Sequence, residues 1–193
     1  MPRPQAYATA DAVRAARGVF WVQGFEGASV PDLERATGLN RSSIYHAFGS
    51  KRGLFDAAVQ SYLDEVVRPR LAVLTGPDVA PDALVAYLTG LRAAIAAADP
   101  AGAGQGCLLV NAATAPIGGD GAVRAVVAGY RAELRTAFER GVAARFPDRD
   151  PVPLADTCTS LVVAAFALAR VDPDGAVRSL DAALSLVAEA QVG

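Results

Sequence analysis

A group of hydrogen-bond donors between residues 29 and 51 offers the clearest chemistry in this 193-residue chain. It comprises Ser29, Asn40, Arg41, Ser42, Ser43, Tyr45, His46 and Lys51. An arginine can donate two parallel hydrogen bonds to guanine, and small hydroxyls allow close approach to a base edge. Cations suit the phosphate oxygens of a nucleic-acid backbone. The donor set therefore favours double-stranded DNA as a partner.

The element expected to precede most of these donors is a short helix that begins at Ser29. Ser29 and Asp32 form a capping box in its acidic form, because the hydroxyl accepts a backbone N–H and the carboxylate complements the helix dipole. Gly38 ends the helix, since glycine adopts the left-handed conformation without strain. The chain then turns tightly into a second helix.

The second helix, over residues 41–48, is expected to present the donors outward. Asn40 caps its N-terminus. Ile44 and Phe48 are four residues apart and pack inward, which leaves the polar residues on or near the outer face. Two short helices joined by a glycine turn form a helix-turn-helix, whose second helix lies in the major groove of DNA.

A third helix is expected to begin after Ser50, its N-cap, with two cations in its first turn. Lys51 and Arg52 oppose the helix dipole there, at a cost of roughly 0.3–1 kcal/mol each. A surface helix without a binding role would favour Asp or Glu at these positions. A phosphate bound at this N-terminus would explain the two cations.

The pattern over residues 9–63 resembles the DNA-binding domain of the TetR family of transcriptional regulators. The matching residues are Phe20, Gly24, Phe25, Ser29, Ala36, Gly38, Leu39, Ser43, Ile44, Tyr45, Phe48, Ser50, Lys51 and Leu54. The resemblance implies an all-helical homodimer and a ligand-responsive repressor that binds a palindromic operator. Three N-terminal helices would bind DNA, and about six further helices would form a ligand pocket and a dimer interface. Arg52 and Gly53 depart from the family, in which an acidic residue is common there.

The resemblance also assigns roles within the donor set. It implies that Tyr45 and Lys51 contact phosphates. It implies that Arg41, Ser42 and His46 face the major groove.

The charge distribution agrees with a DNA-binding end. The whole chain carries a net charge of −2. However, residues 1–55 hold seven Lys/Arg against four Asp/Glu, whereas residues 56–193 hold eleven against sixteen. A basic end on an acidic body attracts DNA at one end only. Because the basic end is only weakly charged, a dimer is expected to be needed for useful affinity.

The rest of the chain is read as helices, so the predicted fold class is all-α. Residues 1–50 are interpreted as the helix-turn-helix DNA-binding domain and residues 51–193 as a helical effector-binding and dimerisation domain. The expected helices cover residues 9–23, 50–67, 81–98, 105–115, 121–145, 154–169 and 174–190, beside the two short ones above.

The last two helices are expected to form the homodimer interface. They carry few charges and many small apolar residues, so each needs cover on more than one side. A partner subunit would supply that cover, and two-fold symmetry would match a palindromic operator. The alternative is that both helices lie inside the core of a single chain.

Cys107 is the candidate sensing residue outside the DNA-binding end. The segment GCLLVN at residues 106–111 resembles a TetR subset that includes repressors responsive to electrophiles. A helix starting at residue 104 or 105 would put the thiol in its first turn, where the thiolate is favoured. The alternative is a buried cysteine that acts as a small hydrophobic residue, which is also the interpretation of Cys158. Ala115 departs from the subset, which commonly has an acidic residue there.

A pocket for an unknown small-molecule effector is expected near Cys107. Asn111 lies four residues further along the same helix face and is the most plausible polar group. Tyr87, Thr114, Tyr130 and Phe138 are further candidate lining residues. The alternative is that the aromatic side chains belong to an ordinary core, as aromatic residues at such positions more often do.

No motif in the sequence indicates catalysis, a cofactor or a metal site. The chain lacks a nucleophile elbow, a P-loop, a zinc-protease motif and a dinucleotide fingerprint. One His and two distant Cys do not form a ligand-spaced cluster. We therefore expect neither an enzyme nor a bound cofactor. The rival interpretations are an enzyme acting through Cys107 and an adaptor protein whose DNA-binding end is vestigial.

No segment predicts export or membrane insertion. The N-terminus lacks the apolar run of a signal peptide. The longest apolar run, residues 161–169, is far shorter than the roughly 20 residues that span a bilayer. Two cysteines form no disulfide framework, so a cytoplasmic protein is expected.

Overall fold

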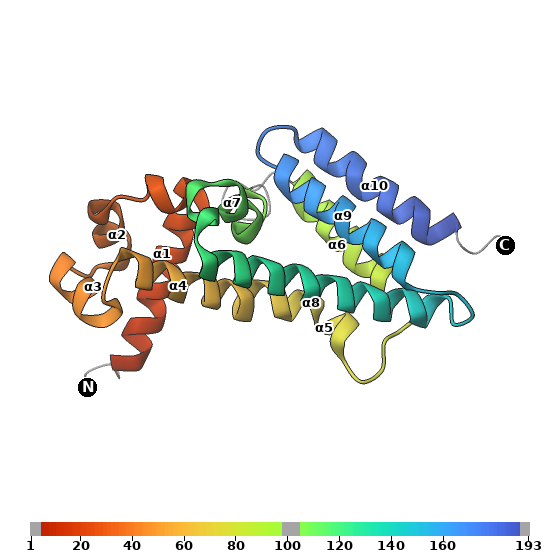
Figure 1. The fold of residues 1–193 in the computed structure, drawn as a ribbon, viewed down its shortest axis with the longest axis horizontal. Helices are drawn as coiled ribbons and strands as arrows, with labels where there is room; N and C mark the ends of the chain where they lie inside the picture. The colour runs from red at the N-terminus through yellow and green to blue at the C-terminus, as the bar shows by residue number, and fades with distance from the viewer. Residues whose placement is uncertain (1–4, 98–104, 190–193) are drawn as a thin grey trace.

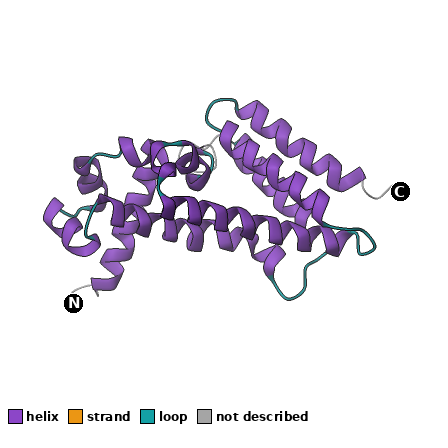
Figure 2. Ribbon diagram, in the orientation of Figure 1, coloured by secondary structure: helices purple, strands orange, loops and turns teal. Residues whose placement is uncertain are grey.

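The computed structural model describes residues 5–97 and 105–189, and within these ranges it contains helices and loops but no strands (Figure 2). The all-α fold predicted from the sequence is confirmed. The elements are α1 (Gln5–Gly27), α2 (Val30–Thr37), α3 (Arg41–Phe48), α4 (Lys51–Tyr62), a π-helical turn (Leu63–Val67), α5 (Arg68–Thr75), α6 (Ala83–Ala96), α7 (Leu108–Thr114), a 3₁₀ turn (Pro116–Gly119), α8 (Gly121–Arg145), α9 (Val152–Leu168) and α10 (Pro173–Glu189).

The helices divide into a small N-terminal group and a longer body. Figure 1 shows α1, α2 and α3 gathered at one end, and α6, α9 and α10 packed together at the other. Helix α8 lies along α5 and α9, while α10 packs on both α9 and α6. Helix α4 packs mainly on α1. We therefore describe α1–α4 as the head and the elements from residue 63 onward as the body.

An aromatic cluster holds the head together. The ring of Phe55 in α4 meets those of Phe20 and Phe25 edge-on, each at 5.2 Å between centroids. Leu33 of α2 and Ile44 of α3 are buried in the same core. Full burial of one such side chain contributes roughly 1.5–3 kcal/mol. The two short helices are therefore fixed to α1 and α4 through a few large apolar contacts.

The connection from α4 to α5 differs from the prediction. The sequence predicts that the helix ends at Val67, because Pro69 follows. Instead, a π-helical turn over Leu63–Val67 leads directly into α5, which continues to Thr75. Arg68 N–H bonds Leu63 C=O, and Pro69 falls in the first turn of α5. A proline is tolerated there, since no N–H is needed in a first turn.

Most of the remaining helix limits lie close to those expected from the sequence, but α1 begins at Gln5 instead of residue 9 and α7 at Leu108 instead of residue 105. The first helix is kinked at Gly24, whose φ of 74° interrupts it one residue after the predicted end. Helices α9 and α10 each begin and end within two residues of the predicted limits. Across residues 5–97 and 105–189, no helix has both the length and the apolar character needed to cross a membrane.

Candidate nucleic-acid interface

Helix α2 begins at the capping box predicted at Ser29. The Ser29 Oγ accepts the Asp32 N–H at 3.2 Å and donates to the Asp32 carboxylate at 2.6 Å. The Ser29 hydroxyl, followed by the Arg35 guanidinium, holds the pKa of Asp32 below its usual value. Gly38 ends the helix with φ 69°. Ser29 is exposed, but its hydroxyl is already bonded within its own cap.

Helix α3 is tied to α2 at its N-terminus. The Asn40 Oδ1 accepts the Ser43 N–H at 2.8 Å, as the predicted cap requires. The Glu34 carboxylate of α2 accepts the Arg41 N–H at 2.5 Å. Two of the free N–H groups at the start of α3 are thereby satisfied. The second bond fixes the angle between the two helices of the helix-turn-helix.

The outer face of α3 presents the predicted donors. Ile44 is buried, whereas Arg41, Ser42, Tyr45 and His46 are exposed. The Arg41 guanidinium lies 5.4 Å from the centre of the Tyr45 ring. Stacking on an aromatic face restricts a flexible arginine and leaves its N–H groups free to donate. The face can therefore approach base edges with its arginine already partly ordered.

The two cations at the start of α4 have different surroundings. The Lys51 ammonium lies 4.6 Å from the centre of the Phe25 ring and has no carboxylate partner among the described residues. Arg52 instead forms ion pairs with Asp56 at 2.8 Å and Asp120 at 2.9 Å. The expectation that both cations are available to a phosphate is therefore wrong for Arg52, whose charge is neutralised within the chain.

Arg52 makes one of several contacts that join the head to the body. Its guanidinium makes two contacts with the Asp120 carboxylate, the N-cap of α8, and holds the pKa of Asp120 well below its usual value. The Glu26 carboxylate accepts the N–H of Ile117 at 2.7 Å. The Trp21 indole donates to Gly106 C=O at 3.2 Å.

Trp21 packs where the head meets the body. Trp21 is nearly buried, and its ring meets Tyr62 edge-on at 5.1 Å. The partners Glu26, Asp120 and Gly106 were missed. They lie 91, 68 and 85 residues from the groups they bind, and no local pattern indicates such pairs.

Cys107 lies outside the helix that was predicted to hold it in its first turn. Helix α7 begins at Leu108, and Cys107 is its extended N-cap with a fully buried thiol. The cause is Gly106, whose φ of 71° excludes a helix through this point. A Cβ at Gly106 would lie 2.4 Å from Phe166 O, so a larger residue does not fit between α7 and α9.

Three phenols surround the Cys107 region. Tyr62 and Tyr130 are buried, and burial followed by the charge of the nearby Cys107 raises the pKa of both. Tyr87 is half-buried and meets the Phe138 ring edge-on at 5.4 Å. The chain thus brings together four of the predicted pocket residues and adds Tyr62, which sequence reasoning did not identify.

The side chains of the other predicted pocket residues bond within α7 and the loop before it, although the Asn111 N–H also bonds the Cys107 C=O at 2.9 Å. The Asn111 side chain donates to Gln105 C=O at 2.9 Å and so supports the loop before α7. Thr114 is exposed, and its hydroxyl donates to Asn111 C=O in its own helix at 3.2 Å. Cys158 is buried in α9, and burial raises the pKa of its thiol to about 11. That thiol stays protonated and inert near neutral pH.

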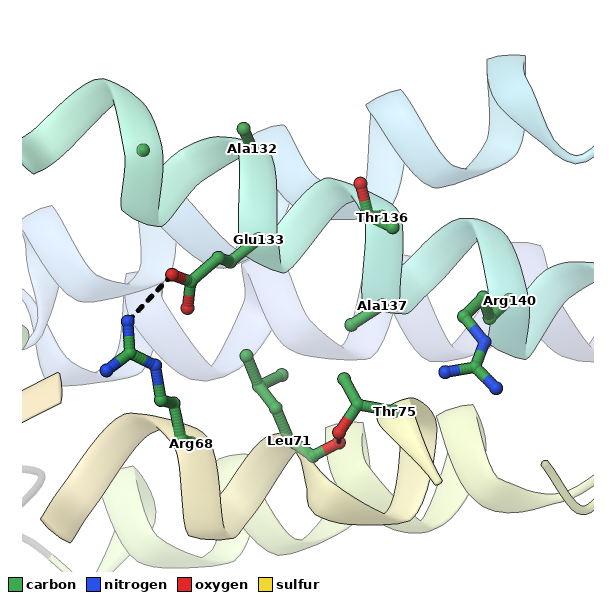
Figure 3. A pocket seen from close by; sticks show the side chains of 9 residues that line it. Arg68, Leu71, Thr75, Ala132, Glu133, Thr136, Ala137 and Arg140 are labelled. Atoms are coloured by element: carbon green, nitrogen blue, oxygen red, sulfur yellow. Dashed lines mark hydrogen bonds and ion pairs between the residues drawn. The ribbon is translucent and has the colours of Figure 1, made fainter. Parts of the chain in front are cut away.

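Grooves between the body helices offer space for a small molecule. The one shown in Figure 3 has a volume of about 580 Å³ and lies between α5 and α8. Leu71 and Ala137 line its floor, with Arg68 and Arg140 toward its two ends. A second groove of about 290 Å³ lies between α5 and α6. Within the described ranges, no three His, Cys, Asp or Glu side chains converge as a metal site would require.

Comparison with known proteins places this arrangement in a family. Residues 12–58 match the profile of bacterial regulatory proteins, tetR family. The HTH-type transcriptional repressor BdcR of Escherichia coli is 36% identical over 72 residues, which cover 37% of this chain and only 36% of BdcR. The HTH-type transcriptional regulator YezE of Bacillus subtilis is 31% identical over 143 residues, covering 74% of this chain and 72% of YezE.

A solved structure extends the similarity to the body. It contains a cysteine-substituted form of the TetR family transcriptional regulator CifR with 26-bp double-strand operator DNA. The similarity covers 95% of this chain and 98% of that one, with 32% identity and a TM-score of 0.75. The head, the helix-turn-helix and the helical body of this chain therefore match as one unit. The chain belongs to the TetR family of transcriptional regulators.

Proposed function

We propose that this protein is a cytoplasmic DNA-binding repressor that responds to a small molecule. The observation that carries the proposal is the outer face of α3, where Arg41, Ser42, Tyr45 and His46 are exposed together beside Lys51. Arg41 and His46 would contact base edges, and Tyr45 and Lys51 would contact phosphates. The similar CifR protein is described with operator DNA. Ser29, Asn40 and Ser43 would support the contact from the helix starts.

The proposed assembly is a homodimer through α9 and α10. These helices leave apolar side chains partly uncovered in the single chain, including Leu161, Val163 and Leu184, and Leu186 is 37% exposed. A second copy would cover them. The two-fold axis would then place the two α3 helices in successive major grooves of a palindromic operator, one helical turn of roughly 34–36 Å apart.

In the proposed response, the body changes the spacing of the two heads. The proposed DNA-binding domain covers residues 1–50, and the proposed effector-binding and dimerisation domain covers residues 51–193. Helix α4 begins at this boundary and therefore connects the two. The Trp21 bond to Gly106 C=O joins α1 to the segment that carries Cys107. An effector that binds one spacing better than the other would lower operator affinity by that difference.

Selection of bound fragments from genomic DNA tests the proposed DNA binding. Retention of one fragment class with a palindromic sequence is expected at low salt. Lys51→Ala should weaken binding to all sequences and lower the slope of log affinity against log salt by about one per subunit. Arg131→Ala is the matched control, because Arg131 is an exposed cation on α8 in the body. A chain that binds no DNA at low salt would instead be an adaptor with a vestigial head.

Cys107 is the proposed sensing residue if the effector is an electrophile. Both thiols are fully buried, and that of Cys107 lies beside Tyr62 and Tyr130. Burial raises the pKa of the Cys158 thiol to about 11, which disfavours its reactive thiolate. Treatment with N-ethylmaleimide should release operator DNA from the native chain and from Cys158→Ser, but not from Cys107→Ser. Release from Cys107→Ser would remove the sensing role and leave the DNA-binding proposal intact.

A further inference from the structure

The groove between α5 and α6 differs from the larger groove between α5 and α8 because its arginine forms no hydrogen bond or ion pair within the described residues. Arg70 lies among the lining residues of this groove, which has a volume of about 290 Å³. The others are apolar or aromatic: Val73, Ala86, Tyr87, Gly90, Leu91 and Ala94. This volume falls at the lower end of the roughly 300–1,000 Å³ typical of small-molecule sites. A ligand held there would be small and largely apolar.

Arg70 has no hydrogen bond or ion pair to any residue within 5–97 and 105–189. The two arginines of the larger groove are engaged. Arg68 pairs with Asp64 and with Glu133 at 2.9 Å, and Arg140 donates to Gly76 C=O. An anion entering the larger groove would have to displace these partners and would meet Glu133. The α5/α6 groove instead offers an uncompensated positive charge.

Arg70 is exposed, and its charge also acts on Tyr62 and Tyr87. Burial raises the pKa of Tyr62 and Tyr87, and Arg70 acts on both in the opposite direction. Because Arg70 lines the groove and is exposed, its guanidinium is accessible to a ligand that enters from solvent. Tyr87, half-buried on Phe138, lines the same groove.

We propose that the α5/α6 groove binds a small organic carboxylate, with its carboxylate on Arg70 and its apolar part against Val73 and Leu91. A guanidinium matches a carboxylate with two parallel hydrogen bonds, so charge and shape are both satisfied. The inference rests on the proposed function, because it names the chemical class of the effector of the same repressor.

The position of the groove connects such a ligand to the head. Helix α5 follows the π-helical turn at Leu63–Val67, which joins it without a break to α4. A π-turn is a weak point in a helix, where the backbone register can change. A ligand inserted between α5 and α6 moves α5, and the π-turn determines how much of that movement reaches α4 and the head.

Calorimetric titration of the full chain with benzoate and with hexanoate tests the site, using benzamide and hexanamide as uncharged counterparts. The carboxylates should bind and the amides should bind at least tenfold more weakly. Arg70→Gln should reduce carboxylate affinity at least tenfold. Arg131→Gln is the matched control, because Arg131 is an exposed arginine without a partner among the described residues and lines a different groove. It should leave the affinity unchanged.

A second pair of variants fills space instead of removing charge. Gly90 lies in α6, and a Cβ added there meets no heavy atom within 4 Å. Gly90→Leu should therefore fold normally and block the groove. Gly129→Leu is its control, because Gly129 has the same free space but lines the α5/α8 groove. Blocking should abolish carboxylate binding in the first variant only.

The results separate the site from the repressor function. Equal binding by the native chain and Arg70→Gln, or no binding of either carboxylate by the native chain, overturns the proposed site. Operator binding by Arg70→Gln should match that of the native chain. A chain that binds carboxylate through Arg70 but binds no operator would keep the site and refute the repressor.

Discussion

The helix limits of the head depend on interactions between residues close in the sequence, whereas several of those in the body depend on residues far apart in the sequence. In the head, three helices begin at a side chain that bonds an N–H three residues later: Ser29, Asn40 and Ser50. In the body, Asp120 and Asp172 cap α8 and α10 in the same way. However, α6, α7 and α9 begin without such a cap in the described structure, at Asp82, Cys107 and Pro151. The start of α7 depends instead on the close approach of Gly106 to α9. We therefore expect single cap substitutions to destabilise the head, and substitutions at contacts between helices to destabilise the body.

The largest expected effect on stability is at Gly106, where three elements meet. Gly106→Ala combines a strained φ of 71° with a Cβ only 2.4 Å from Phe166 O. Strain and overpacking together should lower the free energy of unfolding by roughly 2–4 kcal/mol. Gly24→Ala in the head has a similar φ of 74° but no heavy atom within 4 Å. It should cost about 1–3 kcal/mol, because φ 74° with ψ 173° is a conformation that essentially only glycine adopts.

Urea unfolding of the two glycine variants measures the difference. The contrast depends on the Phe166 carbonyl being fixed by the packing of α9. An equal loss of stability in both variants would show that the segment before α7 adjusts easily. The stability of the body would then depend less on the contact between Gly106 and α9 than we expect.

The next effect concerns recognition rather than stability. Arg41→Ala should reduce the preference for operator over random DNA by about 1–3 kcal/mol, since one bidentate base contact is lost. Tyr45→Phe keeps the ring beneath Arg41 but removes the hydroxyl. It should weaken binding to all sequences and keep the preference. Competition binding with operator and random duplexes checks both, and an unchanged preference in Arg41→Ala would contradict the base-reading role.

A smaller effect is expected from a single cap in the head. Asn40→Ala removes the acceptor of the Ser43 N–H and should cost about 1 kcal/mol of unfolding free energy. Asn40→Asp keeps an acceptor and should cost much less. Thermal unfolding of both variants checks the values. A full-sized loss in Asn40→Asp would mean that Asn40 acts through contacts other than the cap.

The local signals explain why the head could be predicted. Caps, glycine stops and the four-residue spacing of Ile44 and Phe48 act over one or two turns, and the sequence displays them directly. The exposed face of α3 follows once Ile44 is assigned to the core. Arg52 was misread because its partner Asp120 lies 68 residues away.

The body was predicted in outline but not in its contacts. Apolar spacing identified α8, α9 and α10, because long helices bury a continuous stripe. Pro69 predicts a helix end, although a π-turn can place a proline in a first turn. The predicted start of α7 is wrong because the backbone at Gly106 is fixed by its contacts with Phe166 and Trp21, which are far away in the sequence. The groove at Arg70 has no sequence signal, since its lining comes from two helices.

The smallest expected effect lies at the boundary between the two regions. Asp120→Asn removes the charge that meets Arg52 but keeps the oxygen that caps α8. Because both side chains are partly exposed, a double-mutant cycle with Arg52→Gln should give a weak favourable coupling. The Arg52 bond lowers the pKa of Asp120, so this coupling is present above pH 3.8 and is lost as the pH falls through the lowered value.

Two further measurements test the Arg52–Asp120 coupling: its dependence on salt, and a comparison of Asp120→Asn with Asp56→Asn. In 1 M NaCl the coupling should disappear, because screening then acts within about 3 Å. Asp56 also pairs with Arg52, but within α4 alone. Asp56→Asn should therefore leave the effector response unchanged, whereas Asp120→Asn frees the start of α4 from α8 and should alter that response. Identical responses in the two variants would show that the Arg52–Asp120 pair does not connect head and body.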